Sequence, residues 1–182
     1  MDRTALIAAV ERGERPRFLC FWGHTPKSRT VGPWVLSNWF PSPFVIDGVT
    51  YATNEHWMMA EKARLFGDTV ARSRVMKADT PGEAKAIGRE VRDFDDDVWD
   101  AARFDIVARG CEAKFAADAA LRDYLLQTGD AVLVEASPRD RIWGIGLGAS
   151  NPDANDPRRW RGENLLGFAL MEARARLRGV SR

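Results

Sequence analysis

An acid and a base stand seven positions apart in residues 54–66, where they could support acid–base chemistry. At about 3.6 residues per turn, a helix over this segment would place Glu55 and Lys62 within its apolar side. The apolar residues of that side are Met58, Met59, Leu65 and Phe66. A surface helix normally keeps its charges opposite the apolar stripe, so these two groups should be paired, neutralised or turned toward a cavity. The structural alternative is that Glu55 complements the helix dipole and Lys62 extends its amine past the apolar rim.

A second candidate is the glycine-rich stretch 140–148, which contains Asp140 and Trp143. Glycines such as Gly144 let the backbone approach a ligand closely, while the acid and the indole could supply a carboxylate and a stacking surface. The glycine spacing is not that of a dinucleotide-binding loop, and Asn151-Pro152 follows where a helix should begin. A plain glycine-rich turn with a core tryptophan is the alternative interpretation.

Arginines could provide a local anion site. Arg158, Arg159 and Arg161 precede the last expected helix, and helix N-termini bind anions readily. Arg89 and Arg92 allow the same interpretation. In each case a solvated cation is the alternative.

Metal and thiol chemistry have few candidate residues. The chain has only two histidines and two cysteines, so a metal site would need nearly all of these ligands to converge. We therefore expect no metal and no cofactor, and we expect Cys20 and Cys111 to be buried thiols. Seven tryptophans and nine phenylalanines could fill a core, and tryptophans also offer surfaces on which nucleobases stack.

Composition limits the class of protein. A chain of 182 residues predicts one domain, which we place at 1–182. Lys and Arg total 27 against 26 Asp and Glu, so phosphate recognition must be local and cannot come from a global positive field. The apolar run 5–10 is too short to span a membrane and has acidic flanks, so we expect a cytoplasmic protein without membrane contact.

Periodicity and capping signals predict the elements that position these residues. Helices are expected at 2–13, 54–66, 68–77, 80–89, 95–115, 119–128 and 163–178. Two β-prone triplets, 44–46 and 49–51, flank Asp47-Gly48 and predict a tight hairpin, and 131–135 is a short apolar strand candidate before a long loop at 137–162. The expected class is mainly α with a small β element, that is, α+β.

Taken together, these segments resemble the NADAR family, also called YbiA-like. The resemblance covers about residues 18–178 and leaves the helix at 2–13 as an addition to the domain. The matching elements are Leu36-Ser37-Asn38-Trp39, Ile46-Asp47-Gly48-Val49-Thr50-Tyr51, Asn54-Glu55-His56-Trp57, Ala60-Glu61-Lys62, Glu83-Ala84-Lys85-Ala86-Ile87-Gly88-Arg89, Trp99, Ala113-Lys114-Phe115, Leu133-Val134-Glu135, Asp140 with Trp143-Gly144, and Gly162-x-Asn164-x-Leu166-Gly167 ending in Leu170-Met171.

The resemblance implies a compact, mostly helical YbiA-like fold and cleavage of an N-glycosidic bond between ribose and a nucleobase-like amine. The substrate would be a phosphoribosylamino-pyrimidine intermediate of riboflavin synthesis or ADP-ribosylated guanine, including guanine in nucleic acid, and the sequence leaves this choice open. Some relatives carry an acid directly after the Trp-Gly pair, where Ile145 stands here, so a role for that acid does not transfer. The additional loop at 151–161 lengthens the rim of the site.

The resemblance also assigns roles to residues. The catalytic candidates are Glu55, Asp140 and Lys62. The substrate-binding candidates are Trp99, Trp143, Asn38, His56, Arg89, Gly144 and Asn164. We expect Glu55 to have a raised pKa and to move protons, Asp140 to hold the ribose hydroxyls or stabilise an oxocarbenium-like centre, and the two tryptophans to enclose the base.

Two questions stay open at this point. Lys62 could attack the anomeric carbon and form a Schiff base, or it could only pair with an anionic group. The domain itself could be a non-catalytic sensor for ADP-ribose or NAD-like nucleotides, or a helical scaffold without a small-molecule site.

Overall fold

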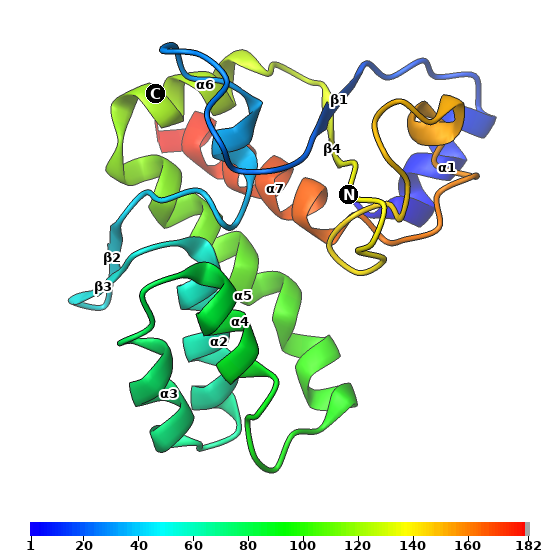
Figure 1. Ribbon diagram of the computed structural model, residues 1–182. Helices are drawn as coiled ribbons and strands as arrows, with labels where there is room; N and C mark the ends of the chain where they lie inside the picture. Colours follow the sequence, from blue (N-terminus) through cyan, green and yellow to red (C-terminus); the bar gives the residue numbers. More distant parts are fainter. Residues whose placement is uncertain (181–182) are drawn as a thin grey trace.

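The computed structural model describes residues 1–180, which form helices and a few short strands (Figure 1). The α-helices are α1 (Arg3–Glu11), α2 (Asn54–Leu65), α3 (Thr69–Val75), α4 (Pro81–Gly88), α5 (Asp96–Ala117), α6 (Ala119–Gln127) and α7 (Leu165–Val180). The strands are β1 (Phe18–Phe21), β2 (Phe44–Ile46), β3 (Val49–Tyr51) and β4 (Val132–Glu135), and two 3-10 helices are η1 (Pro33–Leu36) and η2 (Pro152–Asn155). The prediction of a mainly α, compact fold with a small β element is confirmed.

Side-chain caps fix where most of the helices begin. Thr53 accepts a hydrogen bond from the His56 N–H at the start of α2, and Asp95 does the same for Val98 at the start of α5. Helix α4 begins as its sequence predicts, with Thr80 as cap and Pro81 in the first turn. Each expected helix is present, with boundaries shifted by a few residues.

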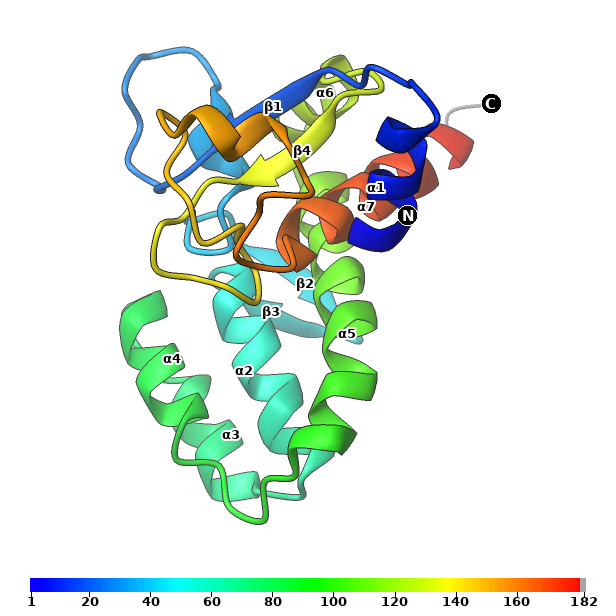
Figure 2. The same cartoon turned by 90° about the vertical axis from the view of Figure 1, so that its right-hand side faces the viewer.

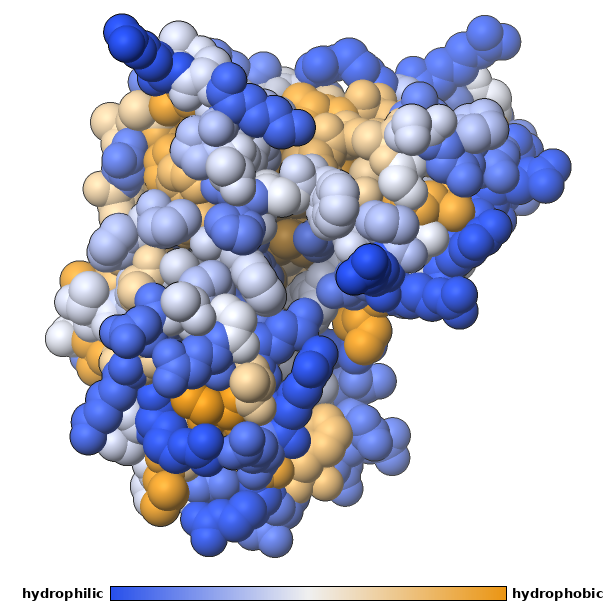
Figure 3. Space-filling model, in the orientation of Figure 1, coloured by the Kyte–Doolittle hydropathy of each residue, from blue (hydrophilic) through white to orange (hydrophobic). Residues whose placement is uncertain are grey.

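Helix α5 connects two parts of the molecule. In Figures 1 and 2 its first half lies beside α2, which separates it from α3 and α4, and its second half lies with α6 and α7, of which α7 also packs on β4. The indole N–H of Trp57 donates to the Ile106 carbonyl at 2.7 Å and ties α2 to α5. On the face shown in Figure 3, hydrophilic residues cover most of the lower part, and the upper part overhangs it on the right.

The parallel pair β1–β4 was not expected from the sequence. Phe18 pairs with Val132 and Phe21 with Glu135, so two segments far apart in the chain form one ladder. Residues 18–21 are too few to show a period, and their partner is set by tertiary contacts. Helix α7 packs on β4 at Gly167, where a Cβ would collide with the Leu133 carbonyl.

The hairpin at Asp47-Gly48 is confirmed. Strands β2 and β3 pair antiparallel, and Asp47 and Gly48 both have positive φ, at 51° and 77°. Two consecutive positive φ values are what a tight type I′ hairpin turn needs, and Asp-Gly supplies them at low cost.

The core corrects one premise about α2. The sequence pattern indicated one apolar stripe, but residues 54–61 of α2 are all buried, and even Glu61, on another face from Glu55, is only 6% exposed. The helix reaches the surface only near its end, at Arg64. Glu61 pairs there with Arg64 at 2.9 Å. The burial of Glu55 therefore comes from the central position of α2 and not from an apolar stripe.

Two smaller expectations also change. Cys111 is buried, but Cys20 is half-exposed and lies on the short strand β1. The last helix begins at Leu165, because Asn164 before it adopts a left-handed φ of 57°. Within residues 1–180, no helix combines the length and apolar character needed to cross a membrane.

Candidate active site

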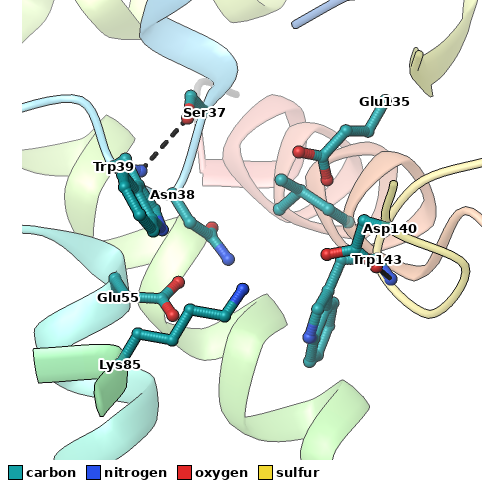
Figure 4. Close-up of a pocket in the computed structure, with 9 residues that line it drawn as sticks. Ser37, Asn38, Trp39, Glu55, Lys85, Glu135, Asp140 and Trp143 are labelled. Atoms are coloured by element: carbon teal, nitrogen blue, oxygen red, sulfur yellow. Dashed lines mark hydrogen bonds between the residues drawn. The ribbon is translucent and has the colours of Figure 1, made fainter. Parts of the chain in front are cut away.

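A small pocket, here called the inner pocket, opens where the two parts of the molecule meet (Figure 4). Its volume is about 40 Å³, enough for only a few atoms of a ligand. Its lining comes from the segment after η1, from α2, α4, β4 and α7, and from the loop after β4. The lining residues are Ser37, Asn38, Trp39, Glu55, Lys85, Glu135, Asp140, Trp143 and Leu166.

Glu55 is the most deeply buried acid of the inner pocket. The residue is 2% exposed, and its Oε1 has no hydrogen-bond partner among the described residues. Burial raises the pKa of this carboxyl to about 7, against smaller opposing effects of the Lys85 amine and the Trp39 indole. A carboxyl that titrates near neutrality can both give and take a proton.

Asp140 faces Glu55 from the opposite wall. Its Oδ1 accepts backbone N–H bonds from Ile142 at 2.9 Å and Trp143 at 2.7 Å, which fixes both the turn and the carboxylate. The other side of the carboxylate is directed into the pocket (Figure 4). The turn therefore presents the acid and the Trp143 ring together.

Glu135 adds a third acid at the carboxyl end of β4. Its side chain points into the pocket from above, and its Oε2 is enclosed without a hydrogen-bond partner in residues 1–180 (Figure 4). Desolvation first, and then the negative charges of Asp140 and Glu55, raise its pKa to about 8. Near neutral pH, the site thus holds enclosed carboxyls that tend to keep their protons.

Lys85 is the cation of the inner pocket. It projects from α4 between Glu55 and Asp140 (Figure 4), and it lowers the pKa of both Glu55 and Glu135. Its amine lies 5.9 Å from the centre of the Trp39 ring. Lys85 therefore places a positive charge among the three acids of the inner pocket.

A buried hydrogen-bond network supports the wall that carries Asn38 and Trp39. Asn54 donates to Asn38 Oδ1 at 2.8 Å, and the Lys114 amine donates to the Val35 and Ser37 carbonyls at 2.6 and 2.8 Å. Lys114 is 1% exposed, and desolvation lowers its pKa to about 8. The Lys114 ammonium thus fixes the backbone at the end of η1 and just after it. This backbone presents Asn38 to the pocket.

Lys62 and Trp99 form a separate cluster. The Lys62 amine lies 3.9 Å from the Phe94 ring centre and 5.7 Å from that of Trp99, and neither residue lines the inner pocket. Partial burial lowers the pKa of Lys62, while Asp96 opposes this. Two turns of helix, about 10 Å, separate it along α2 from Glu55.

Three other candidates are occupied by internal contacts. The ring nitrogens of His56 lie 2.8 Å from Thr53 Oγ1 and 3.1 Å from the Ala78 carbonyl. Asn164 bonds to β4, and Gly144 is tightly packed, since a Cβ there would come within 2.9 Å of the Glu135 carbonyl. These residues shape the site from outside the inner pocket.

The arginine candidates separate into two groups. Arg92 pairs with Asp68 at 3.1 Å and Arg158 with Asp156 at 2.8 Å, so both have internal partners. Arg89 ends α4, is exposed, and is close enough to lower the pKa of Glu55.

The structure brings together Glu55, Asp140, Trp143 and Asn38 as the sequence suggested, and it adds residues that sequence reasoning missed. The missed residues with a polar or aromatic group at the pocket are Ser37, Trp39, Lys85 and Glu135. Each stands inside a motif that carried the family resemblance. The available signal for Glu135 was an acid directly after an apolar strand, and for Lys85 a cation on a short capped helix.

The fold and the pocket define a class: an α+β domain whose central helix presents a buried acid to a pocket with further acids, a lysine and tryptophan walls. The sequence matches the NADAR domain family over residues 20–178, and the chain belongs to this family.

Named relatives agree with this assignment. The N-glycosidase R617 of Acanthamoeba polyphaga mimivirus is 40% identical over 156 residues, which cover 83% of this chain and 92% of that protein. The N-glycosidase YbiA of Escherichia coli (strain K12) is 32% identical over 142 residues, covering 78% and 80%. The NMR structure of the E. coli protein YbiA superposes with a TM-score of 0.73 at 27% identity, covering 92% of this chain and 89% of that one.

Proposed function

We propose that this protein is an N-glycosidase that hydrolyses the bond between a ribose and a nucleobase-like amine. The observation that carries the proposal is the carboxyl of Glu55, enclosed opposite Asp140 with a pKa of about 7. Its relatives R617 and YbiA are named N-glycosidases, which supports the same reaction class.

The chemistry requires a proton for the leaving group and stabilisation of positive charge on the sugar. When the C1′–N bond breaks, its electron pair stays on the base nitrogen, and protonated Glu55 supplies the proton there. Water then adds to C1′, and its proton returns to the Glu55 carboxylate. Asp140 lies on the opposite wall, where its negative charge would stabilise the oxocarbenium-like centre or hold the ribose hydroxyls.

The remaining groups bind the substrate in this proposal. Trp143 and Trp39 offer aromatic surfaces for the base, and the Asn38 amide can hydrogen-bond its polar edge. Lys85 would pair with a substrate phosphate. No cofactor takes part in this scheme.

The substrate is proposed as one of two classes, a phosphoribosylamino-pyrimidine of the riboflavin type or ADP-ribosylated guanine. The test is to incubate the purified protein with each class and to identify the released base by mass spectrometry. Release from either substrate, lost in Glu55→Gln, supports the proposal. Binding without release from both would instead identify a nucleotide sensor.

The role of Lys62 stays a prediction with two alternatives. If its amine attacks the anomeric carbon, borohydride should trap a covalent adduct with the native enzyme and none with Lys62→Ala. A fully active Lys62→Ala variant would remove this residue from catalysis.

A further inference from the structure

Helix α1 contacts the long loop between β4 and α7, which contains η2 (Figure 1). The Arg3 guanidinium donates to the Trp160 carbonyl at 2.6 Å and to the Pro157 carbonyl at 3.1 Å. It also lies 3.7 Å from the Glu163 carboxylate near the end of the loop. Residues 20–178 match the family, so Arg3 holds this loop from outside the matched segment.

The apolar side of α1 supports the same contact. Leu6 is 1% exposed and belongs to an apolar cluster that also contains Ile145 and Trp160. Ile145 follows the Trp143-Gly144 pair in the chain. The cluster therefore joins α1 both to the segment just after Trp143 and to the tryptophan whose carbonyl Arg3 binds.

Backbone N–H groups just after Trp160 donate to carbonyls of the turn that carries Asp140 and Trp143. The donor–acceptor pairs are Arg161–Ile145 and Glu163–Arg141 at 2.9 Å, Leu166–Trp143 at 3.1 Å, and Asn164–Gly144 and Leu165–Ile142 at 3.2 Å. The two segments are in close contact, since a Cβ at Gly162 would collide with the Gly144 carbonyl. The position of the turn therefore depends on where residues 160–166 lie.

We propose that Arg3 is a positioning residue for the inner pocket. By fixing the loop, its guanidinium holds residues 160–166 against the turn, and Asp140 and Trp143 are thereby kept opposite Glu55. A displacement of about 1 Å can cost an enzyme about 100-fold in rate, so a contact outside the pocket can act on turnover. The effect on turnover rests on the proposed function, whereas the effect on the turn does not.

Hydrogen–deuterium exchange tests the turn directly. In Arg3→Ala, the amides of residues 141–147 and 160–166 should exchange at least about ten-fold faster, because the released loop opens more often, while those of α2 should not change. Arg12→Ala is the matched control, since Arg12 lies just after the same helix and pairs with Glu14 at 2.9 Å. No acceleration, acceleration confined to residues 155–159, or equal acceleration in α2 would each overturn the proposal.

Steady-state kinetics test the link to the reaction, with whichever of the two proposed substrate classes the native protein cleaves. Folded Arg3→Ala should lose about ten-fold or more in kcat at saturating substrate, and Arg12→Ala should keep the native value. Arg3→Lys retains a cation that can reach one carbonyl, so it should show a smaller loss and smaller acceleration of exchange. The lysine variant also serves if Arg3→Ala does not fold.

The two measurements separate this inference from the proposed function. Native kcat in an Arg3→Ala protein whose turn exchanges faster would overturn the positioning role. If the native protein releases no base from either substrate class, the proposed function fails, and the exchange measurement still decides whether Arg3 holds the turn.

Discussion

Asn164 holds the strand that presents Glu135. Its side-chain Oδ1 accepts the backbone N–H of Glu135 at 2.9 Å, and its Nδ2 donates to the Leu133 carbonyl at 2.9 Å. Asn164 is fully buried and has a left-handed φ of 57°, a conformation that asparagine tolerates better than most residues. The Asn164 side chain thus hydrogen-bonds the backbone of β4 as a neighbouring strand would, and it fixes the position of Glu135 in the inner pocket.

Loss of this contact should weaken the fold. Asn164→Ala leaves two buried backbone groups unpaired and puts alanine at positive φ, so the free energy of unfolding should fall by about 2–4 kcal/mol. Urea denaturation measures this. Asn151→Ala, which removes a single bond to the Asp153 N–H on the half-buried loop, should cost about 1 kcal/mol or less. Equal losses in the two variants would contradict the role given to Asn164.

Glu55 should dominate the rate. Glu55→Gln keeps the shape of the side chain and removes the acid, so kcat should fall about 10²- to 10⁴-fold while the melting temperature holds or rises. The matched control is Glu61→Gln on the same helix, where the acid pairs with Arg64 away from the inner pocket. Activity of Glu55→Gln within a few-fold of the native enzyme would reject the proton-transfer role.

Stability should fall as pH rises because of Glu55. Its pKa is about 7 in the fold against 4.5 ordinarily, so between these values the native state holds more protons than the unfolded chain. The penalty is absent below about pH 4.5 and fully present above about pH 7, and it amounts to a few kcal/mol. Glu135 acts with the same sign from about pH 4.5 up to about pH 8, since its pKa is raised from 4.5 to about 8.

The measurement compares native protein and Glu55→Gln by thermal unfolding at pH 5 and pH 8. The variant should gain stability relative to the native protein at pH 8 by several degrees more than at pH 5. A stability difference that does not change with pH would show that Glu55 is not desolvated in solution.

Lys85 should set the pH range of activity. Its positive charge lowers the pKa of both Glu55 and Glu135, so Lys85→Met should raise both values. If protonated Glu55 is the active form, the high-pH limb of the kcat/KM profile should move upward by half a unit or more, and Lys85→Arg should largely prevent this. If Lys85→Met left the high-pH limb of the kcat/KM profile unchanged, Lys85 would not control the pKa of the titrating acid, whatever the change in KM.

Local sequence determined much of the secondary structure. Thr53, Thr80 and Asp95 cap helices where their hydroxyl or carboxylate can reach the first-turn N–H groups, and Asp47-Gly48 makes the hairpin turn. These caps and this turn depend on contacts between residues within about four positions of one another, so the local sequence is sufficient to predict them. The motifs that resemble the NADAR family also contained all the polar and aromatic residues of the inner pocket.

Tertiary structure decided which of those residues meet. Glu55 and Lys62 share one helix, yet Glu55 lines the inner pocket and Lys62 lies against Phe94 and Trp99, because α2 is enclosed by different elements along its length. Glu135 enters the site only because β1 and β4 pair across most of the chain and Asn164 supports that pair. The sequence by itself determined the acids, the caps and the turns. Their convergence, and with it the raised pKa of Glu55, depended on desolvation that arises only when distant segments pack together.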